Sequence, residues 1–195
     1  QRNALLKSAR AVKNPDLSTL DIWDDQLVSL GVELILQRLE LIEKLGPLLS
    51  DFYQKLSGAN EEIQLSLVSA IEEDDQYGEL PSSREELSTL FYERLAETRS
   101  KELERGITLV GPHRDELLIQ KDGLVARSHA SQGEAWSIAL GLKLSLATLI
   151  RENSNLGDPV LLLDDVFAVL DVGSRARLLE FVLGYEQVIV TAADK

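Results

Sequence analysis

Hydrophobic residues recur at intervals of three and four between Leu20 and about Leu56, with charged residues between them. This period is that of amphipathic helices, which bury one face and expose the other. The apolar positions are Ile22, Trp23, Leu27, Leu30, Leu34, Leu41, Leu45, Leu48 and Phe52. Because Gly46-Pro47 falls inside the stretch, we expect two antiparallel helices that together form an arm. An arm that packs on a partner and an ordinary helical subdomain fit this pattern equally well.

Two further helices and one strand are expected in the first 105 residues. Residues 1–13 are expected to be the end of a helix, which Asn14-Pro15-Asp16 interrupts. Residues 63–69 alternate as in a half-buried strand, and the acidic run from Glu72 to Asp75 forms a loop with Gly78. Pro81-Ser82-Ser83 then precedes a helix that ends near Arg105. Residues 1–105 are therefore expected to form a helical arm subdomain, α+β in class, with a short strand near 63–69.

After Gly106 the pattern changes to short strands that alternate with helices. The expected strands are 107–110, 117–120, 124–126, 160–164 and 187–191, and the expected helices are 131–152 and 174–183. Between Ala135 and Ile150 the only charged residue is Lys143, so this helix is expected to be buried nearly all round. The alternation predicts an α/β fold for residues 106–195.

The composition fits a chain that buries a sizeable core, since 44% of its 195 residues are hydrophobic. It contains no cysteine, which fits a reducing, cytoplasmic location, and no apolar run approaches the length of a membrane span. The absence of methionine indicates a fragment of a longer protein. The net charge of −13 argues against a nonspecific nucleic-acid clamp, although Arg2, Lys7, Arg10 and Lys13 precede the first acidic residue. We interpret both kinds of charged cluster as solvated surface.

Paired carboxylates follow a fully apolar strand at Asp164-Asp165. In doubly wound α/β folds ligands bind beyond the carboxyl ends of strands, where a carboxylate can hold Mg²⁺ against nucleotide phosphates. We expect Asp164 to hold Mg²⁺ through its water shell, and Asp165 to orient or deprotonate the attacking water. The alternative is a strand end whose carboxylates cap the next turn.

A second candidate element, Ser131-Gln132-Gly133-Glu134, opens the long apolar helix. One interpretation is a capping box, in which Ser131 and Glu134 satisfy helix-end amides and no ligand is needed. The other is an anion site suited to a γ-phosphate, because a helix N-terminus presents amides, a serine hydroxyl and a glycine that permits close approach. The residues leave both interpretations open.

The order of these motifs resembles the C-terminal half of an ABC-type ATPase head. Ser-Gln-Gly-Glu resembles the signature loop, LLLDD the Walker B strand, and Ala168 to Asp171 the D-loop. Within that superfamily the segment GPHRDEL, Gly111 to Leu117, closely resembles the RecF family of recombination and repair proteins. The resemblance covers about residues 100–195 and, more loosely, the helical arm before them.

The resemblance implies an ATP- and Mg²⁺-dependent homodimer. The signature loop of one subunit, Ser131 to Glu134, would cover the nucleotide held by the other, and Asp171 would lie at the dimer seam. The family binds DNA at gaps and at junctions between single and double strands, and helps the RecO and RecR partners load recombinase. A weak DNA-dependent ATPase is expected of the full-length dimer, and no activity of this fragment. No membrane partner is expected.

Three departures from the ABC pattern stand out. No glycine is followed by lysine, so the G-x-x-x-x-G-K-[ST] phosphate loop is absent and is expected N-terminal to Gln1. Asp165 stands where many ABC ATPases have glutamate, which predicts slow hydrolysis. The final strand leads to Thr191-Ala192-Ala193, so the switch histidine common after it is missing and γ-phosphate sensing is unassigned.

Two side chains of the GPHRDEL segment, His113 and Arg114, are further candidates for a functional role. His113 and Asp115 lack a third metal ligand nearby, which favours a structural role over a metal site. Arg114 is a candidate contact for phosphate or the DNA backbone, with an ion pair to Asp115 or Glu116 as the alternative. Two other functions stay open for the whole chain: an SMC-type DNA clamp with a long coiled coil, and a non-catalytic helical interaction module.

Overall fold

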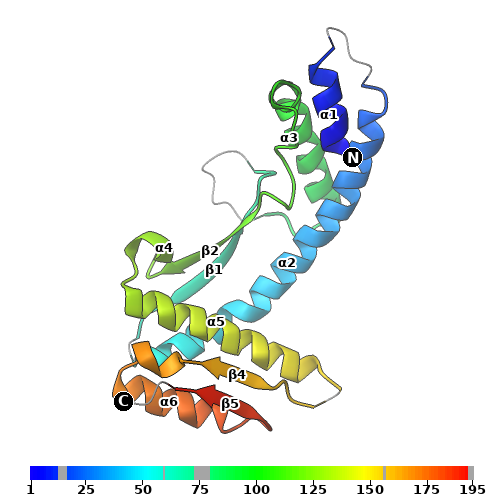
Figure 1. Cartoon of the computed structure of the whole chain (residues 1–195). Coiled ribbons are helices and arrows are strands. Elements are labelled where there is room, and N and C mark those ends of the chain that lie inside the picture. The colour runs from blue at the N-terminus through cyan, green and yellow to red at the C-terminus, as the bar shows by residue number, and fades with distance from the viewer. Residues whose placement is uncertain (13–16, 59, 73–79, 156, 193–195) are drawn as a thin grey trace. The chain divides into compact units, whose positions relative to one another are not determined.

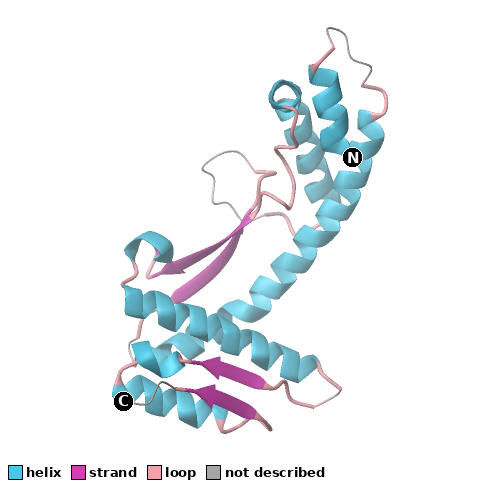
Figure 2. Ribbon diagram, in the orientation of Figure 1, coloured by secondary structure: helices cyan, strands magenta, loops and turns pink. Residues whose placement is uncertain are grey.

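The computed structural model describes residues 1–12, 17–58, 60–72, 80–155 and 157–192, which form a mixed α/β protein (Figures 1 and 2). The chain divides into two compact units. The first comprises Gln1–Leu41 and Ser66–Leu117, and the second Ile42–Leu65 and Leu118–Lys195. Each unit combines residues from both sides of position 105, where the sequence places the boundary between arm and head. That boundary stays a prediction.

The first unit is built on three helices: α1 (Arg2–Arg10), the first part of α2 (Leu20–Ser57) and α3 (Arg84–Arg105). The predicted start of α3 is confirmed, because the Ser83 side chain accepts a hydrogen bond from the Glu86 amide. Gly106 ends α3 in the left-handed region at φ 69°, which favours glycine. The predicted helix break at Asn14-Pro15-Asp16 and the predicted loop from Glu73 to Gly78 lie outside the described residues.

A buried ionic cluster joins the three helices of this unit. The Arg2 guanidinium donates to Asp24 at 2.7 Å, to Glu102 at 2.5 and 3.0 Å, and to the Thr108 hydroxyl at 2.8 Å. Glu102 is fully buried, so its charge depends on Arg2 and on the Leu109 amide, which donates at 2.8 Å. The cluster connects α1, α2, α3 and the segment after Gly106.

The predicted strand at 107–110 is wrong. Its alternating burial is real, with Thr108 and Val110 buried, but its backbone is not paired in a sheet. The Thr108 amide donates to the Asn3 side chain at 2.7 Å, and the Leu109 amide donates to Glu102. Side chains of α1 and α3 therefore take the place of a neighbouring strand.

The predicted break at Gly46-Pro47 is also wrong, because α2 runs through Pro47 without interruption. Proline removes one backbone donor and strains the preceding turn. On both sides of it the helix buries large apolar side chains, among them Leu45, Leu49 and Phe52. Burial of each stabilises the helix by about 1.5–3 kcal/mol, which offsets the local cost of about 3 kcal/mol.

A three-stranded sheet contains β1 (Ile63–Val68), β2 (Glu116–Lys121) and β3 (Leu124–Val125), in that order. The predicted hairpin is confirmed, with Lys121 opposite Leu124. Its turn needs two positive φ values, 48° at Asp122 and 77° at Gly123. The third predicted residue of the last strand, Ala126, instead begins the short helix α4 (Ala126–His129).

The rest of the second unit has the predicted α/β alternation. It consists of α5 (Gln132–Asn153), β4 (Leu161–Asp164), the 3₁₀ helix η1 (Val166–Val169), α6 (Val172–Val182) and β5 (Val188–Thr191). Strands β4 and β5 pair in parallel, as a helical crossover requires. The buried core beneath them consists of Phe52, Leu56, Leu140, Leu144, Ala147, Leu161, Leu163, Val166, Leu170, Leu178, Val182 and Tyr185.

Helix α5 corrects two expectations. It is buried on one side only: Ile138 and Leu144 lie in the core, whereas Leu146 is 37% and Ile150 49% exposed. By length and composition alone it is also apolar enough to cross a membrane, and it is the one such helix in the described part of the chain. The prediction that no apolar segment approaches this length is therefore wrong. The buried face of α5 packs against α2 through Leu49, which would lie 3.0 Å from a Cβ placed on Gly141.

The buried cluster of the first unit predicts a stability difference between neighbouring glutamates. Replacement of Glu102 by Gln removes one of the two carboxylate charges that Arg2 faces, so we expect Glu102→Gln to lower the free energy of unfolding by about 3 kcal/mol. Glu104 lies two residues further along α3 and is exposed, so Glu104→Gln should change the free energy of unfolding by no more than about 0.5 kcal/mol. Urea unfolding compares them, and equal stabilities would contradict the role of Glu102.

Candidate functional site

The candidate carboxylates lie at the carboxyl end of the parallel pair β4 and β5. Parallel pairing places Asp164 directly opposite Thr191. The Thr191 hydroxyl donates to Asp164 Oδ1, and the Asp165 amide donates to Thr191 Oγ1 at 3.0 Å. Both aspartates are exposed. Thr191 therefore fixes the end of β4, a role that the sequence did not suggest.

Asp165 has a backbone conformation that is rare for its residue type. Its φ is 49° and its ψ 28°, in the left-handed region. A non-glycine residue there costs of the order of 1 kcal/mol or more, and such residues cluster at functional sites. The turn directs the chain from β4 into η1, where Val166 is buried. Burial of Val166 helps to hold Asp165 in this conformation.

The donor set at this edge suits a magnesium ion that keeps most of its water ligands. Asp164 supplies a carboxylate, and Mg²⁺ in nucleotide sites is typically held by one or two carboxylates together with phosphates. Within the described residues, no group of three or more His, Cys, Asp or Glu side chains is placed to hold a metal. The described protein side chains at this edge therefore do not form a complete set of metal ligands by themselves.

At the start of α5 the capping box is confirmed. The Ser131 hydroxyl accepts from the Glu134 amide at 3.4 Å, and the Ser131 amide donates to Glu134 Oε2 at 2.7 Å. The box leaves the amides of Gln132 and Gly133 at the helix N-terminus, where no intrahelical acceptor exists. A Cβ placed on Gly133 would meet nothing within 4 Å, so there is open space on the Cβ side of this glycine. Anion binding by this loop stays a prediction.

Glu134 is held from a second side by Lys121. The Lys121 ammonium donates to Glu134 Oε1 and, at 2.9 Å, to Glu61 Oε1. The ammonium and then the Ser131 hydrogen bonds lower the pKa of the Glu134 carboxyl to about 2. The two carboxylates in turn raise the pKa of Lys121 above its usual value. Glu134 is thus part of the support of the loop.

The support extends into the core through Glu61 and Tyr53. The Tyr53 ring is fully buried, and its hydroxyl donates to Glu61 Oε2 at 3.0 Å. Burial, followed by the adjacent Glu61 carboxylate, raises the pKa of the Tyr53 hydroxyl to about 12. Sequence reasoning missed Lys121, Glu61 and Tyr53, because their separation along the chain gives no spacing signal.

Asp171 caps the first turn of α6. Its carboxylate accepts from the Ser174 amide at 3.0 Å and from the Ser174 hydroxyl at 2.6 Å. These hydrogen bonds lower the pKa of the Asp171 carboxyl below its usual value. Asp171 is exposed, so the cap does not prevent a further contact. Its place at a dimer seam stays a prediction.

Arg114, in the first unit, donates weakly to the Thr108 carbonyl at 3.3 Å. The neighbouring Asp115 carboxylate is fully buried and accepts from Arg38 at 3.0 Å, from the Ser69 hydroxyl at 2.8 Å and from the Ala70 amide at 3.1 Å. The ion-pair partner of Asp115 is therefore Arg38, and Asp115 has a structural role. The weak Arg114 bond leaves the exposed guanidinium available for a phosphate contact, which stays a prediction.

Comparison with known proteins gives relatives along the whole chain. No family model matches. DNA replication and repair proteins from three bacteria each match 99% of the chain. The chain is 49% identical over 202 residues to the protein of Leifsonia xyli subsp. xyli, 47% identical over 207 residues to that of Clavibacter sepedonicus, and 45% identical over 198 residues to that of Streptomyces avermitilis. It spans 52%, 51% and 51% of their lengths, that is, about half of the curated relatives it matches.

Solved structures agree with these relatives. The recombination mediator protein RecF-ATPrS of the RecFOR pathway superposes with a TM-score of 0.82 at 28% identity, and RecF-ATP of the same pathway with a TM-score of 0.78 at 31% identity. Each match covers 100% of this chain and 50% of the other. The relatives thus define the class, DNA replication and repair proteins, and the chain has the mixed α/β fold of one half of such a protein. Within that class the chain belongs to the RecF family, as its motifs predict.

The contacts of Lys121 predict that it fixes the start of α5. Lys121→Met keeps the side-chain length but removes the charge, so the pKa of Glu134 should rise from about 2 toward its ordinary value. A carboxyl group whose pKa is lower in the folded state than in the unfolded state stabilises the fold at pH values above its unfolded-state pKa, and this contribution is lost as the pH falls through its folded-state pKa. The variant should therefore lose stability at neutral pH and little below pH 2. Amide exchange at residues 131–135 should become faster.

Lys143→Met is the matched control, since Lys143 is an exposed lysine on α5 itself. Carboxyl NMR titration gives the pKa, and hydrogen exchange at neutral pH gives the mobility of the loop. A Glu134 pKa that stays near 2 in Lys121→Met would show that the capping box alone sets it.

Proposed function

We propose that this chain supplies the signature loop and the magnesium-binding carboxylates of an ATP-dependent DNA recombination mediator. The observation that carries the proposal is the exposed pair Asp164 and Asp165 at the carboxyl edge of β4, in a chain related over its whole length to RecF proteins. In α/β folds this edge is where nucleotide ligands bind. Residues 106–195 are proposed as the C-terminal part of an ABC-type head, and residues 1–105 as its arm.

The two carboxylates have different roles in the proposal. Asp164, oriented by the Thr191 hydroxyl, holds the water shell of Mg²⁺. When bound, Mg²⁺ neutralises charge on the ATP phosphates. Asp165 orients the attacking water and accepts its proton. The shorter aspartate, in place of the glutamate common in ABC ATPases, places the base farther from that water, so we expect slow hydrolysis.

The start of α5 acts on the nucleotide of the partner subunit. The amides of Gln132 and Gly133 and the Ser131 hydroxyl face a γ-phosphate, to which a helix N-terminus is complementary in charge. Glu134 contributes by holding the loop. Asp171 lies at the seam, so ATP joins two subunits into a homodimer. The dimer binds DNA at gaps and junctions, Arg114 contacts phosphate, and RecO and RecR are its partners in the cytoplasm.

The first functional prediction separates the two aspartates in the full-length protein. Asp165→Asn keeps the shape of the side chain but removes a base, so ATP binding should stay nearly intact while turnover falls by at least about 100-fold. Asp164→Asn should act earlier and weaken Mg²⁺-dependent ATP binding. Calorimetric titration and steady-state hydrolysis measure the two effects, and wild-type turnover in both variants would end the paired-carboxylate hypothesis.

The second functional prediction tests the trans role of Ser131. Ser131→Arg should leave ATP binding by the monomer intact but block the ATP-dependent dimer, because a large cation would fill the space of the partner's γ-phosphate. Sedimentation of the full-length protein with and without ATP measures this. Ser131→Ala serves as the control for lost capping, which should cost about 1 kcal/mol of stability. A normal ATP-dependent dimer of a folded Ser131→Arg variant would reduce the motif to a capping box.

A further inference from the structure

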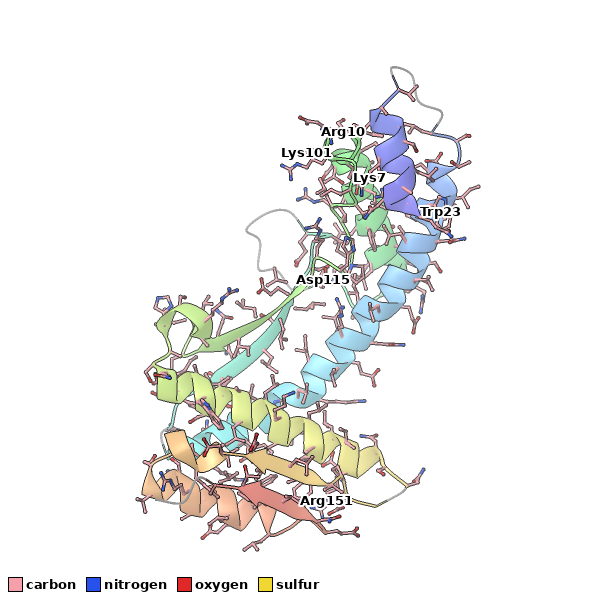
Figure 3. The ribbon with its side chains drawn as sticks, in the orientation of Figure 1. Lys7, Arg10, Trp23, Lys101, Asp115 and Arg151 are labelled. Atoms are coloured by element: carbon pink, nitrogen blue, oxygen red, sulfur yellow. The ribbon has the colours of Figure 1, made fainter. Side chains whose placement is uncertain are left out.

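Four basic side chains gather at the ends of α1 and α3 in the first unit. Lys7 and Arg10 are one turn apart on α1, and Lys101 and Arg105 are one turn apart on α3. All four are exposed, and none has an ion-pair or hydrogen-bond partner among the described residues. Figure 3 shows Lys7, Arg10 and Lys101 at this end of the unit. We call Lys7, Arg10, Lys101 and Arg105 the α1–α3 basic surface.

Contacts between the two helices bring these cations together. Arg2, at the start of α1, bonds Glu102, and Lys7, one and a half turns later, lies against Gly106. A Cβ placed on Gly106 would lie 3.2 Å from Lys7 Cγ and 3.4 Å from Lys7 Cα. The helices therefore run side by side in the same direction and end together (Figure 1). The buried Arg2 cluster makes this arrangement rigid.

The helix dipoles account for the positions of three of the four cations. Lys7, Arg10 and Arg105 lie in the last turns of their helices, where cations typically stabilise by about 0.3–1 kcal/mol. Lys101 lies one turn before the end of α3, and the dipole gives no reason for a cation there. Glu104, also exposed, is the acidic neighbour on this turn. Four cations without an ion-pair partner among the described residues, with Glu104 beside them, are notable in a chain of net charge −13.

We propose that the α1–α3 basic surface contacts the phosphate backbone of double-stranded DNA. A duplex presents a negative charge about every 1.7 Å along its axis, so several phosphates lie within reach of cations on two adjacent helix ends. The proposal rests on the DNA-binding function proposed above and assigns that function a surface. Backbone contacts of this kind position a protein without reading sequence. The acidic remainder of the chain repels DNA, which favours contact at this surface.

The test uses the full-length protein with ATP and a gapped duplex, followed by fluorescence anisotropy from about 50 to 200 mM salt. The variants Lys7→Gln/Arg10→Gln and Lys101→Gln/Arg105→Gln each remove two cations. If both cations contact phosphates, the slope of log affinity against log salt should become shallower in each variant by about 1.8 for each subunit whose basic surface contacts the duplex. Over this salt range, the affinity lost by the variant should be about tenfold less than that lost by wild type for each such subunit.

Two further variants sharpen the test. Lys44→Gln/Lys55→Gln removes two exposed lysines of α2 in the second unit, and its salt slope should equal that of wild type. Glu104→Gln removes a negative charge from the basic surface itself and should strengthen DNA binding. A merely structural role of the cations would change thermal stability but not the salt slope, so melting curves are compared for every variant.

The outcomes separate the surface from the function. If wild type binds the gapped duplex and both double variants keep its salt slope, the proposed surface is wrong and the DNA-binding function stands. Loss of a protein partner with unchanged DNA binding would also overturn the proposal, in favour of an acidic protein surface. If wild type with ATP does not bind DNA at any salt concentration, the proposed function fails together with the surface.

Discussion

Lys121 joins three segments of the second unit that are far apart in the sequence. Its ammonium bonds Glu61, which Tyr53 holds from the core, and Glu134, which belongs to the capping box of α5. A helix N-terminus binds an anion well only when its amides are already in place, because ordering them on binding costs affinity. The lysine therefore supplies the constraint on which the proposed anion site depends.

Because of this constraint, Glu134 and Ser131 have different roles within the loop. The Glu134 carboxylate is occupied by Lys121 and by the Ser131 amide, so its negative charge is neutralised where a phosphate would otherwise be repelled. The Ser131 hydroxyl accepts from the Glu134 amide and keeps its own hydrogen for donation. The capping and anion-binding interpretations are compatible, since the box builds the surface that an anion meets.

The sequence predicted most local structure of the fold, because local rules determined it. The β2–β3 hairpin, the Ser83 and Ser131 caps and the β4–α6–β5 alternation depend on spacing and turn residues that are visible in one dimension. The errors at 107–110 and at Pro47 have the opposite origin. Distant partners decided both: Asn3 and Glu102 replaced a strand partner, and core packing kept α2 continuous through the proline.

For the candidate site, the sequence identified the chemistry but not its supports. Asp164, Asp165, Ser131 and Gly133 stand in motifs, whereas Thr191 and Lys121 become relevant only when the chain folds. Thr191 faces Asp164 because β4 and β5 pair in register, and Lys121 reaches Glu134 because the hairpin lies beside α5.

The net charge of the chain likewise does not predict the local charge of one surface. A total of −13 argued against a nucleic-acid clamp, yet binding depends on the local field, and screening over about 10 Å lets a small basic surface act against an acidic remainder. Such a surface would bind DNA weakly by itself, so the proposed ATP-driven dimerisation, which would double it, would provide a physical route from nucleotide binding to DNA affinity.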